Sequence, residues 1–107
     1  VLEQLQGDGS LSEERFAEAY VRQRCGRGYG PIRIRQELRE RGLDAELVSA
    51  ALAAVETPWR TLAETARRKK FGEEPPEDFE ARARQMRFLN YRGFDENQIR
   101  AALGGRD

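Results

Sequence analysis

The apolar residues in the first half of the chain recur three or four positions apart in three stretches, which is the period of amphipathic helices. The first stretch follows Ser12, a residue type that often caps helix starts, and stops before the glycine-rich segment 26–30. The second begins at Pro31 and stops at Gly42, which suit a first turn and a helix end. The third follows Asp44, another capping residue. The three predicted helices carry these apolar positions: Phe16, Ala17, Tyr20, Val21, Ile34, Leu38, Leu47, Val48, Ala51, Leu52 and Val55.

The same pattern restarts in the second half. Thr57 is expected to cap a fourth helix, with Pro58 at its first helical position. The Pro75-Pro76 pair separates this helix from a fifth, and Asp95 caps a sixth. No segment predicts a strand, because the one candidate, 29–34, holds a proline and an arginine and has no partner strand elsewhere. These three helices carry the following apolar positions: Trp59, Leu62, Ala63, Ala66, Phe79, Ala83, Met86, Leu89, Ile99, Ala102 and Leu103.

The two halves also share residues when one is superposed on the other with an offset of 51 positions. The matches run through a helix end, a cap and an apolar stripe: Leu38 with Leu89, Arg41-Gly42 with Arg92-Gly93, Asp44 with Asp95, and 50–52 with 101–103. This indicates an internal repeat of about fifty residues. We therefore predict an all-α fold of tandem three-helix repeats stacked into an elongated, curved array, with repeats at 11–56 and 57–107.

Composition narrows the chemistry. The chain has no histidine, and Cys25 is its one cysteine, so its residues provide no Cys/His metal site and no imidazole base. We expect no enzyme activity, cofactor, metal or small-molecule substrate. A lone cysteine, expected to be mostly buried, forms no intrachain disulfide, which suits the cytoplasm. The longest apolar run, 50–55, has six residues, against about 20 for a membrane span.

Charge is balanced in total and uneven along the chain. The 107 residues contain 19 cations and 19 carboxylates, yet 15–41 holds eight arginines against three glutamates, and 60–70 holds five cations against one. Such clusters with an aromatic residue between them can bind a phosphate backbone or an acidic protein surface. The alternative is a solvated helix face with ion pairs such as Arg33 with Glu37. The candidate partner-binding residues are Arg22, Arg24, Arg27, Tyr29, Arg33, Arg35, Arg39, Arg41, Arg67, Arg68, Lys69 and Lys70.

Three further features favour structural roles. The spacing Gly26-x-Gly28-x-Gly30 has no preceding strand and no following lysine-serine pair, so it predicts a turn between helices and no phosphate-binding loop. Tyr29 inside it either packs on a neighbouring helix or presents its ring to a partner. Trp59 shares an apolar face and is expected in the core. The acidic run between 73 and 80 precedes a helix, where exposed amides favour negative charge.

Two longer runs carry a resemblance to a known family. The first comprises Arg15-Phe16-Ala17-Glu18-Ala19-Tyr20 and then Gly28-Tyr29-Gly30-Pro31-x-Arg33-Ile34-Arg35-x-Glu37-Leu38 with Arg41-Gly42-Leu43. The second comprises Lys69-Lys70-Phe71-Gly72 and Arg87-Phe88-Leu89-x-x-Arg92-Gly93-Phe94. Together they strongly resemble the RecX family of bacterial RecA regulators. Members are usually longer, with a further three-helix repeat at the N-terminus, so this chain is similar to a truncated form. The resemblance implies that residues 1–10 are the remnant of the last helix of that preceding repeat plus a linker.

The resemblance implies a helical protein that binds the RecA filament on single-stranded DNA and restrains its ATPase and strand-exchange activities. It implies no catalytic residues. Contact with single-stranded DNA is expected through the filament or as weak direct binding. Two other functions remain open from the residues: an autonomous DNA-binding module like a helix-turn-helix unit, and a helical scaffold for another acidic or mixed-charge partner.

Overall fold

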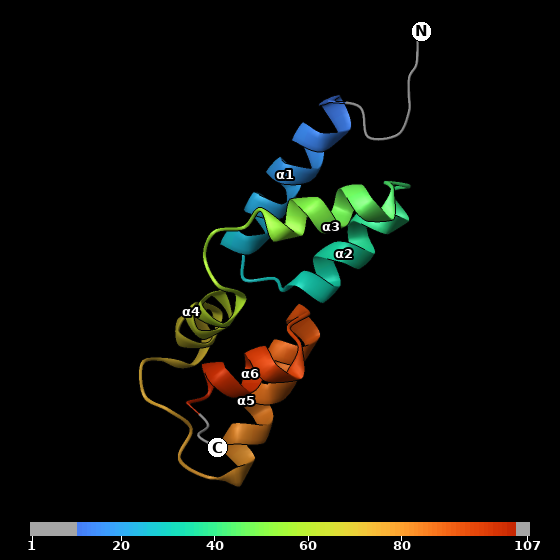
Figure 1. The fold of residues 1–107 in the computed structure, drawn as a ribbon. Coiled ribbons are helices and arrows are strands. Elements are labelled where there is room, and N and C mark those ends of the chain that lie inside the picture. Colours follow the sequence, from blue (N-terminus) through green and yellow to red (C-terminus); the bar gives the residue numbers. More distant parts are fainter. Residues whose placement is uncertain (1–10, 105–107) are drawn as a thin grey trace, which may run out of the picture.

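Six α-helices make up the fold. A computed structural model describes residues 11–104, and all the regular elements within that range are helices (Figure 1). The prediction of an all-α protein with two three-helix units in tandem is confirmed. The remnant predicted at residues 1–10 lies outside the described residues. The helices are α1 (Leu11–Gly26), α2 (Pro31–Glu40), α3 (Ala45–Ala53), α4 (Trp59–Phe71), α5 (Phe79–Arg92) and α6 (Glu96–Ala102).

Aspartates cap three of these helices. The side chain of Asp44 accepts a hydrogen bond from the Glu46 amide at 2.9 Å at the start of α3. Asp78 caps α5 in the same way, so at least this member of the acidic run serves a helix start. Asp95 caps α6 and forms a capping box, because the Gln98 side chain accepts from the Asp95 amide in return. The short α3 and α6 thus depend on local caps as well as on packing.

Two predicted caps are wrong. Ser12 lies inside α1, since the helix already runs at Leu11. The cap of α4 is Pro58, not Thr57, because Pro58 has an extended ψ of 141° and its carbonyl accepts the first helical hydrogen bonds, from Thr61 and Leu62. A proline at this position costs no helical hydrogen bond, because a capping residue needs no amide donor inside the helix.

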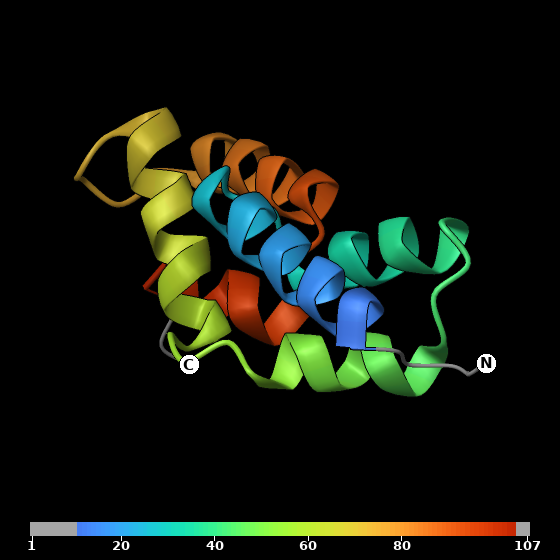
Figure 2. The same ribbon diagram turned by 90° about the horizontal axis from the view of Figure 1, so that it is seen from above.

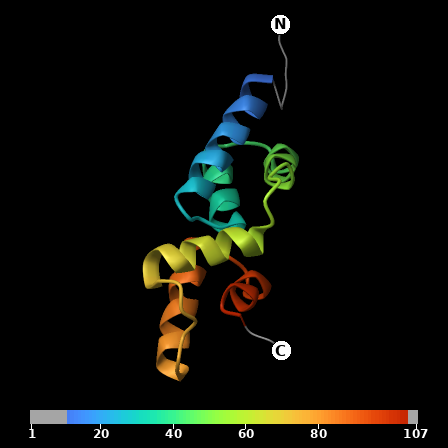
Figure 3. The ribbon, with the colours of Figure 1, turned by 90° about the vertical axis from the view of Figure 1, so that its left-hand side faces the viewer.

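Each unit has its own hydrophobic core. The first is built on Ile34, Leu38 and Val48, and the second on Leu89 and Phe94, all of them almost completely buried. Trp59, predicted to be a core residue, is partly buried and packs against both cores at the start of α4. In Figure 3, α4 runs across the molecule between the first unit and the pair α5 and α6. Trp59 and α4 therefore link the two units.

The two units form an elongated body, as predicted. Its principal extents are 59, 22 and 20 Å and its radius of gyration is 16.1 Å, whereas a compact chain of this length has a radius of about 13 Å. Among the described helices, none is both long enough and apolar enough to cross a bilayer.

The apolar face of α5 differs from the prediction. Phe79 is 83% exposed and Met86 40% exposed, whereas Gln85 and Leu89 are buried. Leu89 is three residues from Met86 and four from Gln85, so the apolar pattern extends equally well along either face. The face that packs against α4 and α6 is the one with Gln85, since Gln85 accepts a hydrogen bond from Arg67 of α4.

A backbone junction joins the units where the turn after α1 meets the end of α5. The Gly30 amide donates to the Arg92 carbonyl at 2.7 Å, and the Ile32 amide donates to the Gly93 carbonyl at 2.9 Å. These amides and carbonyls are groups that helix ends otherwise leave unpaired. Figure 2 shows α5 leading into α2 nearly end to end, an arrangement in which the helix dipoles are aligned.

The junction requires glycine at two positions, because the two units approach too closely there to leave room for a Cβ atom. A Cβ on Gly30 would lie 2.5 Å from the Gly93 carbonyl, and a Cβ on Gly93 would overlap the Arg33 side chain and lie 2.6 Å from its backbone nitrogen. Gly93 also has a φ of +99°, which favours glycine. The glycine-rich stretch is therefore a turn between helices, as predicted, and it has the further role of holding the second unit.

Candidate anion-binding cleft between the two units

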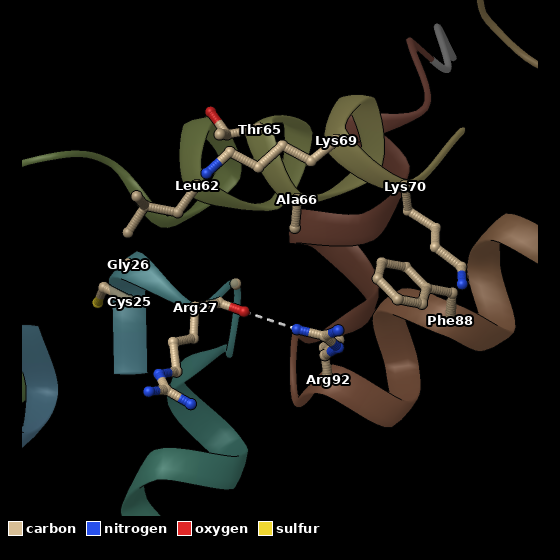
Figure 4. Close-up of a pocket in the computed structure, with 11 residues that line it drawn as sticks. Cys25, Gly26, Arg27, Leu62, Thr65, Ala66, Lys69, Lys70, Phe88 and Arg92 are labelled. Atoms are coloured by element: carbon tan, nitrogen blue, oxygen red, sulfur yellow. Dashed lines mark hydrogen bonds between the residues drawn. The ribbon is translucent and has the colours of Figure 1, made fainter. Parts of the chain in front are cut away.

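A cleft of about 470 Å³ opens beside the junction, where the turn after α1, one face of α4 and the end of α5 converge (Figure 4). Four of its residues are cationic, and none of the lining residues is a carboxylate. The cations come from both units, so the cleft exists only when the units are docked. Its lining residues are Cys25, Gly26, Arg27, Gly28, Leu62, Thr65, Ala66, Lys69, Lys70, Phe88 and Arg92.

The last turn of α4 supplies Lys69 and Lys70. Cations are favourable at this end of a helix, where the carbonyl groups are unpaired. The Lys70 ammonium lies 5.8 Å from the centre of the Phe88 ring, and Phe88 is fixed by an edge-to-face contact with Phe71 at 5.4 Å. In Figure 4, the Lys69 side chain runs back along α4 towards Leu62. Both lysines are exposed, and neither forms an ion pair with a described residue.

Arg92 connects the walls of the cleft. Its guanidinium donates to the Arg27 carbonyl at 2.6 Å and lies 4.8 Å from the ring centres of both Tyr29 and Phe88. Sequence reasoning missed Arg92 and Phe88 as site residues, although Arg92 stood out as part of the repeated Arg-Gly helix end. The repeat pattern indicated the helix end, but which partner it meets depends on tertiary packing.

Tyr29 is packed within the first unit and the junction. Its ring is surrounded by guanidinium groups, with Arg24 at 4.0 Å, Arg33 at 4.9 Å and Arg92 at 4.8 Å from the ring centre. Each contact of this kind contributes about 0.5–1 kcal/mol at partly exposed sites. Of the two roles considered for Tyr29, the structure supports packing on neighbouring helices.

Glu37 balances the charge of these arginines. It accepts hydrogen bonds from Arg24 at 2.7 and 3.0 Å, from Arg33 at 3.1 Å and from the Tyr20 hydroxyl at 2.7 Å. Burial alone would raise the pKa of Glu37, but these hydrogen bonds outweigh it and hold the pKa below its ordinary value of 4.5. The hydrogen bond to Glu37 in turn raises the pKa of Arg24. Arg24 and Arg33 therefore belong to an internal ion-pair cluster.

The remaining predicted cations of the first unit lie away from the cleft, apart from Arg27, which lines it. Arg35 donates to the Ser49 hydroxyl, Arg39 donates to the Leu43 carbonyl, and Arg41 lies over the rings of Phe16 and Tyr20. Arg22 is exposed on α1. None of these four arginines lines the cleft.

In the second unit, Arg68 pairs with Glu64 on its own helix at 3.2 Å. Cys25, half-buried at the end of α1, lines the cleft, and burial raises the pKa of its thiol.

Arg67 is a correction to the predicted set. Only 3% of it is exposed, and its guanidinium donates to the carbonyls of Glu73 and Glu74 and to the Gln85 side chain. It points inward because the helical period that places its neighbours Lys69 and Lys70 outside places Arg67 on the buried face of α4. Arg67 fixes the loop before α5 and is not accessible to a partner.

Comparisons with known proteins agree with this architecture. Residues 12–52 match the family model of the second three-helix domain of RecX, and residues 60–103 match that of the third. A "Regulatory protein RecX" of Pseudomonas putida strain GB-1 is 44% identical over 106 residues, which is 99% of this chain and 68% of that protein. The chain belongs to the RecX family.

Other RecX relatives are similarly close. Those of Halorhodospira halophila strain DSM 244 / SL1 and Xanthomonas axonopodis pv. citri strain 306 are 44% and 46% identical, over 100% and 94% of this chain. The chain covers 66% and 62% of their lengths, and so spans about two thirds of the curated RecX proteins that it matches. Both relatives are named "Regulatory protein RecX".

Proposed function

We propose that this chain binds RecA filaments on single-stranded DNA and restrains their ATPase and strand-exchange activities, with the cleft between the units as an anionic contact. Membership of the RecX family supports the RecA partner. The observation that carries the site is the convergence of Arg27, Lys69, Lys70 and Arg92 from both units around a cleft whose lining has no carboxylate. Such a cleft suits a DNA phosphate or a carboxylate cluster of the filament.

The mechanism we propose is differential binding. A regulator changes filament assembly or ATP turnover only as far as it binds one filament state better than another. An elongated body 59 Å long can contact more than one subunit of a helical filament at once. A cleft whose cations come from both units would then bind best where the spacing of anionic groups along the filament matches the spacing of those cations.

The first experiment measures the single-stranded-DNA-dependent ATPase of RecA while this chain, and separately the longer RecX protein of Pseudomonas putida strain GB-1, is titrated at two salt concentrations. The test variant is Lys69→Glu/Lys70→Glu, because both lysines are exposed and neither contributes to the junction. The matched control is Arg60→Glu/Arg84→Glu, which reverses two exposed cations that do not line the cleft, on two helices of the second unit. Circular dichroism checks that both variants stay helical.

We expect half-inhibition to require roughly ten times more of the cleft variant than of the unsubstituted chain, which corresponds to about 1.4 kcal/mol or more of lost binding free energy. The control variant should require less than twice as much. Equal inhibition by both variants would reject the cleft as the contact. Absence of inhibition by this chain, with inhibition by the longer protein, would place the regulatory surface outside these two units. Arg33 is unsuitable for this test because it pairs with Glu37 and donates to the Tyr91 carbonyl.

A second candidate function is autonomous DNA binding, which the same carboxylate-free cleft favours. The balance of 19 cations and 19 carboxylates over the whole chain opposes strong binding to free DNA. Fluorescence anisotropy with labelled oligo(dT), without RecA, distinguishes the two functions. Tight binding with a steep salt dependence, lost in Lys69→Glu/Lys70→Glu, would favour the DNA-binding module over the RecA regulator.

A further inference from the structure

A second groove, separate from the cleft, lies between α5 and α6. It has a volume of about 670 Å³ and shares no residue with the cleft. Its floor is formed by apolar side chains that are exposed to solvent, since Phe79 is 83% exposed and Met86 is 40% exposed. The lining residues are Phe79, Arg82, Ala83, Met86, Arg87, Asn90, Glu96 and Ile99.

The fold of the second unit does not account for this apolar floor. The core uses another face of α5, which carries Gln85, Phe88 and Leu89. Phe79, Ala83 and Met86 follow the i, i+4, i+7 spacing, so they form a second stripe along the same helix. Stripes of this spacing beside a neighbouring helix receive the apolar face of an amphipathic helix in known recognition modes.

The charges around the groove indicate which kind of helix it fits. The side chains of Arg82 and Arg87 form no ion pair or hydrogen bond with any described residue. Glu96, the one carboxylate of the lining, is already paired with Arg100 at 2.6 Å. The free charge on the rim is therefore positive, and it lies on both sides of an apolar floor.

We propose that this groove binds an acidic amphipathic helix of a partner protein, with apolar side chains on Phe79 and Met86 and carboxylates facing Arg82 and Arg87. A second copy of this chain is disfavoured, because a symmetric contact would bring the same two arginines against each other. A phosphate backbone would match the arginines but gain nothing from the apolar floor. The inference goes beyond the cleft function and does not depend on it.

The test uses the isotope-labelled chain and three designed peptides of about 15 residues. The first peptide has leucines at i, i+3/i+4 and i+7 with glutamates beside them, the second replaces the glutamates by lysines, and the third scrambles the first. We expect only the first to shift the amide signals of Phe79, Ala83, Met86 and Ile99. Shifts from the lysine peptide of equal size, shifts elsewhere, or no shift from any peptide would overturn the proposal.

Variants assign the binding to the groove. Phe79→Ala/Met86→Ala and, separately, Arg82→Glu/Arg87→Glu should each weaken binding of the first peptide at least tenfold. Ile32→Ala removes another apolar side chain, 53% exposed, outside the groove and should leave binding unchanged. Lys69→Glu/Lys70→Glu should also bind the peptide normally, so failure of the cleft function is distinguished from failure of this proposal.

Two further arms exclude other occupants. Oligo(dT) that shifts the groove signals as strongly as the acidic peptide would overturn the proposal in favour of nucleic acid. Sedimentation equilibrium of the unliganded chain should give a monomer. A dimer that Phe79→Asp dissociates would instead assign the groove to self-association.

Discussion

The two units end their middle helices with the same residue pair, Arg41-Gly42 after α2 and Arg92-Gly93 at the end of α5. Of these two helix ends, the one at α5 forms the junction between the units. Both glycines have a left-handed backbone, with φ of +93° and +99°. A Cβ on Gly42 would meet no atom within 4 Å, whereas a Cβ on Gly93 would overlap Arg33 of the other unit. The local sequence thus determines how a helix ends, while the role of that end depends on what is packed against it.

The residue five positions before each glycine shows the same divergence. In the first unit it is Glu37, which pairs with Arg24 and Arg33. In the second it is Phe88, which lines the cleft and packs edge-on against Phe71. One repeated position therefore serves charge balance in one unit and an aromatic wall in the other.

The largest expected effect comes from Gly93→Ala compared with Gly42→Ala. Both substitutions force alanine into a left-handed conformation, which costs about 1 kcal/mol. Gly93→Ala must also push the backbone of Arg33 away and break the junction hydrogen bonds, so we expect a loss of about 3 kcal/mol or more. Urea unfolding followed by circular dichroism measures both.

The control for this comparison is the shape of the molecule. Small-angle scattering should give an unchanged radius of gyration for Gly42→Ala, and a larger one for any Gly93→Ala population in which the units have separated. Equal losses of stability in the two variants would show that the junction contributes nothing beyond backbone strain.

Much of the fold followed from local signals. The periodicity, the capping aspartates and the glycine stops predicted six helices in two units, because these features act within a few residues of each other. The errors were also local in origin: Ser12 and Thr57 have the right chemistry for caps but lie one or more positions from the actual helix start. In α5, Leu89 fits two stripes, and only packing against α4 and α6 selects between them.

The candidate site was predicted less well. Charge clustering pointed to Lys69 and Lys70, which do line the cleft, but also to Arg67, which is buried beneath the loop before α5. Arg92 was missed as a site residue because its neighbours, Arg27 and Tyr29, are more than 60 positions away in the sequence. Spacing within a segment gives no information on such contacts.

An intermediate effect is expected from Glu37→Gln. This substitution tests the charge-balancing role of the repeated position that is Glu37 in the first unit and Phe88 in the second. The substituted amide would keep the shape of the side chain but weaken the hydrogen bonds from Arg24, Arg33 and Tyr20, because each would lack a charged acceptor. We expect a loss of about 1–2 kcal/mol at pH 7. The matched variant is Glu40→Gln, because Glu40 is exposed on the same helix, and its loss should stay within about 0.5 kcal/mol.

The pH dependence gives this prediction a sign. The pKa of Glu37 is lower in the folded protein than its ordinary value of 4.5, so its carboxylate stabilises the fold above that value. That stabilisation is lost as the pH falls through the lower, folded pKa. The stability gap between the natural chain and Glu37→Gln should therefore be full at pH 7 and shrink below about pH 4.5. A gap that stays constant down to pH 3 would contradict the charge-based explanation.

The last comparison of the two helix ends comes from Arg92→Ala and Arg41→Ala, whose expected losses of stability differ by about 1 kcal/mol. Both arginines lie over two aromatic rings, Arg92 over Tyr29 and Phe88, and Arg41 over Phe16 and Tyr20. Stacking therefore contributes to both, at about 0.5–1 kcal/mol. Of these two arginines, Arg92 also donates to a carbonyl of the other unit, which adds about 1 kcal/mol.

We expect Arg92→Ala to cost about 1.5–2 kcal/mol and Arg41→Ala about 0.5–1 kcal/mol in urea unfolding, since the hydrogen bond to the Arg27 carbonyl exists at one end only. Combining each substitution with Gly93→Ala distinguishes stabilisation within one unit from stabilisation of the contact between the two units. If the bond matters because it joins the units, Arg92→Ala should cost much less once Gly93→Ala has opened the junction, whereas the cost of Arg41→Ala should be unchanged. Additive losses in both double variants would mean that Arg92, like Arg41, stabilises only its own unit.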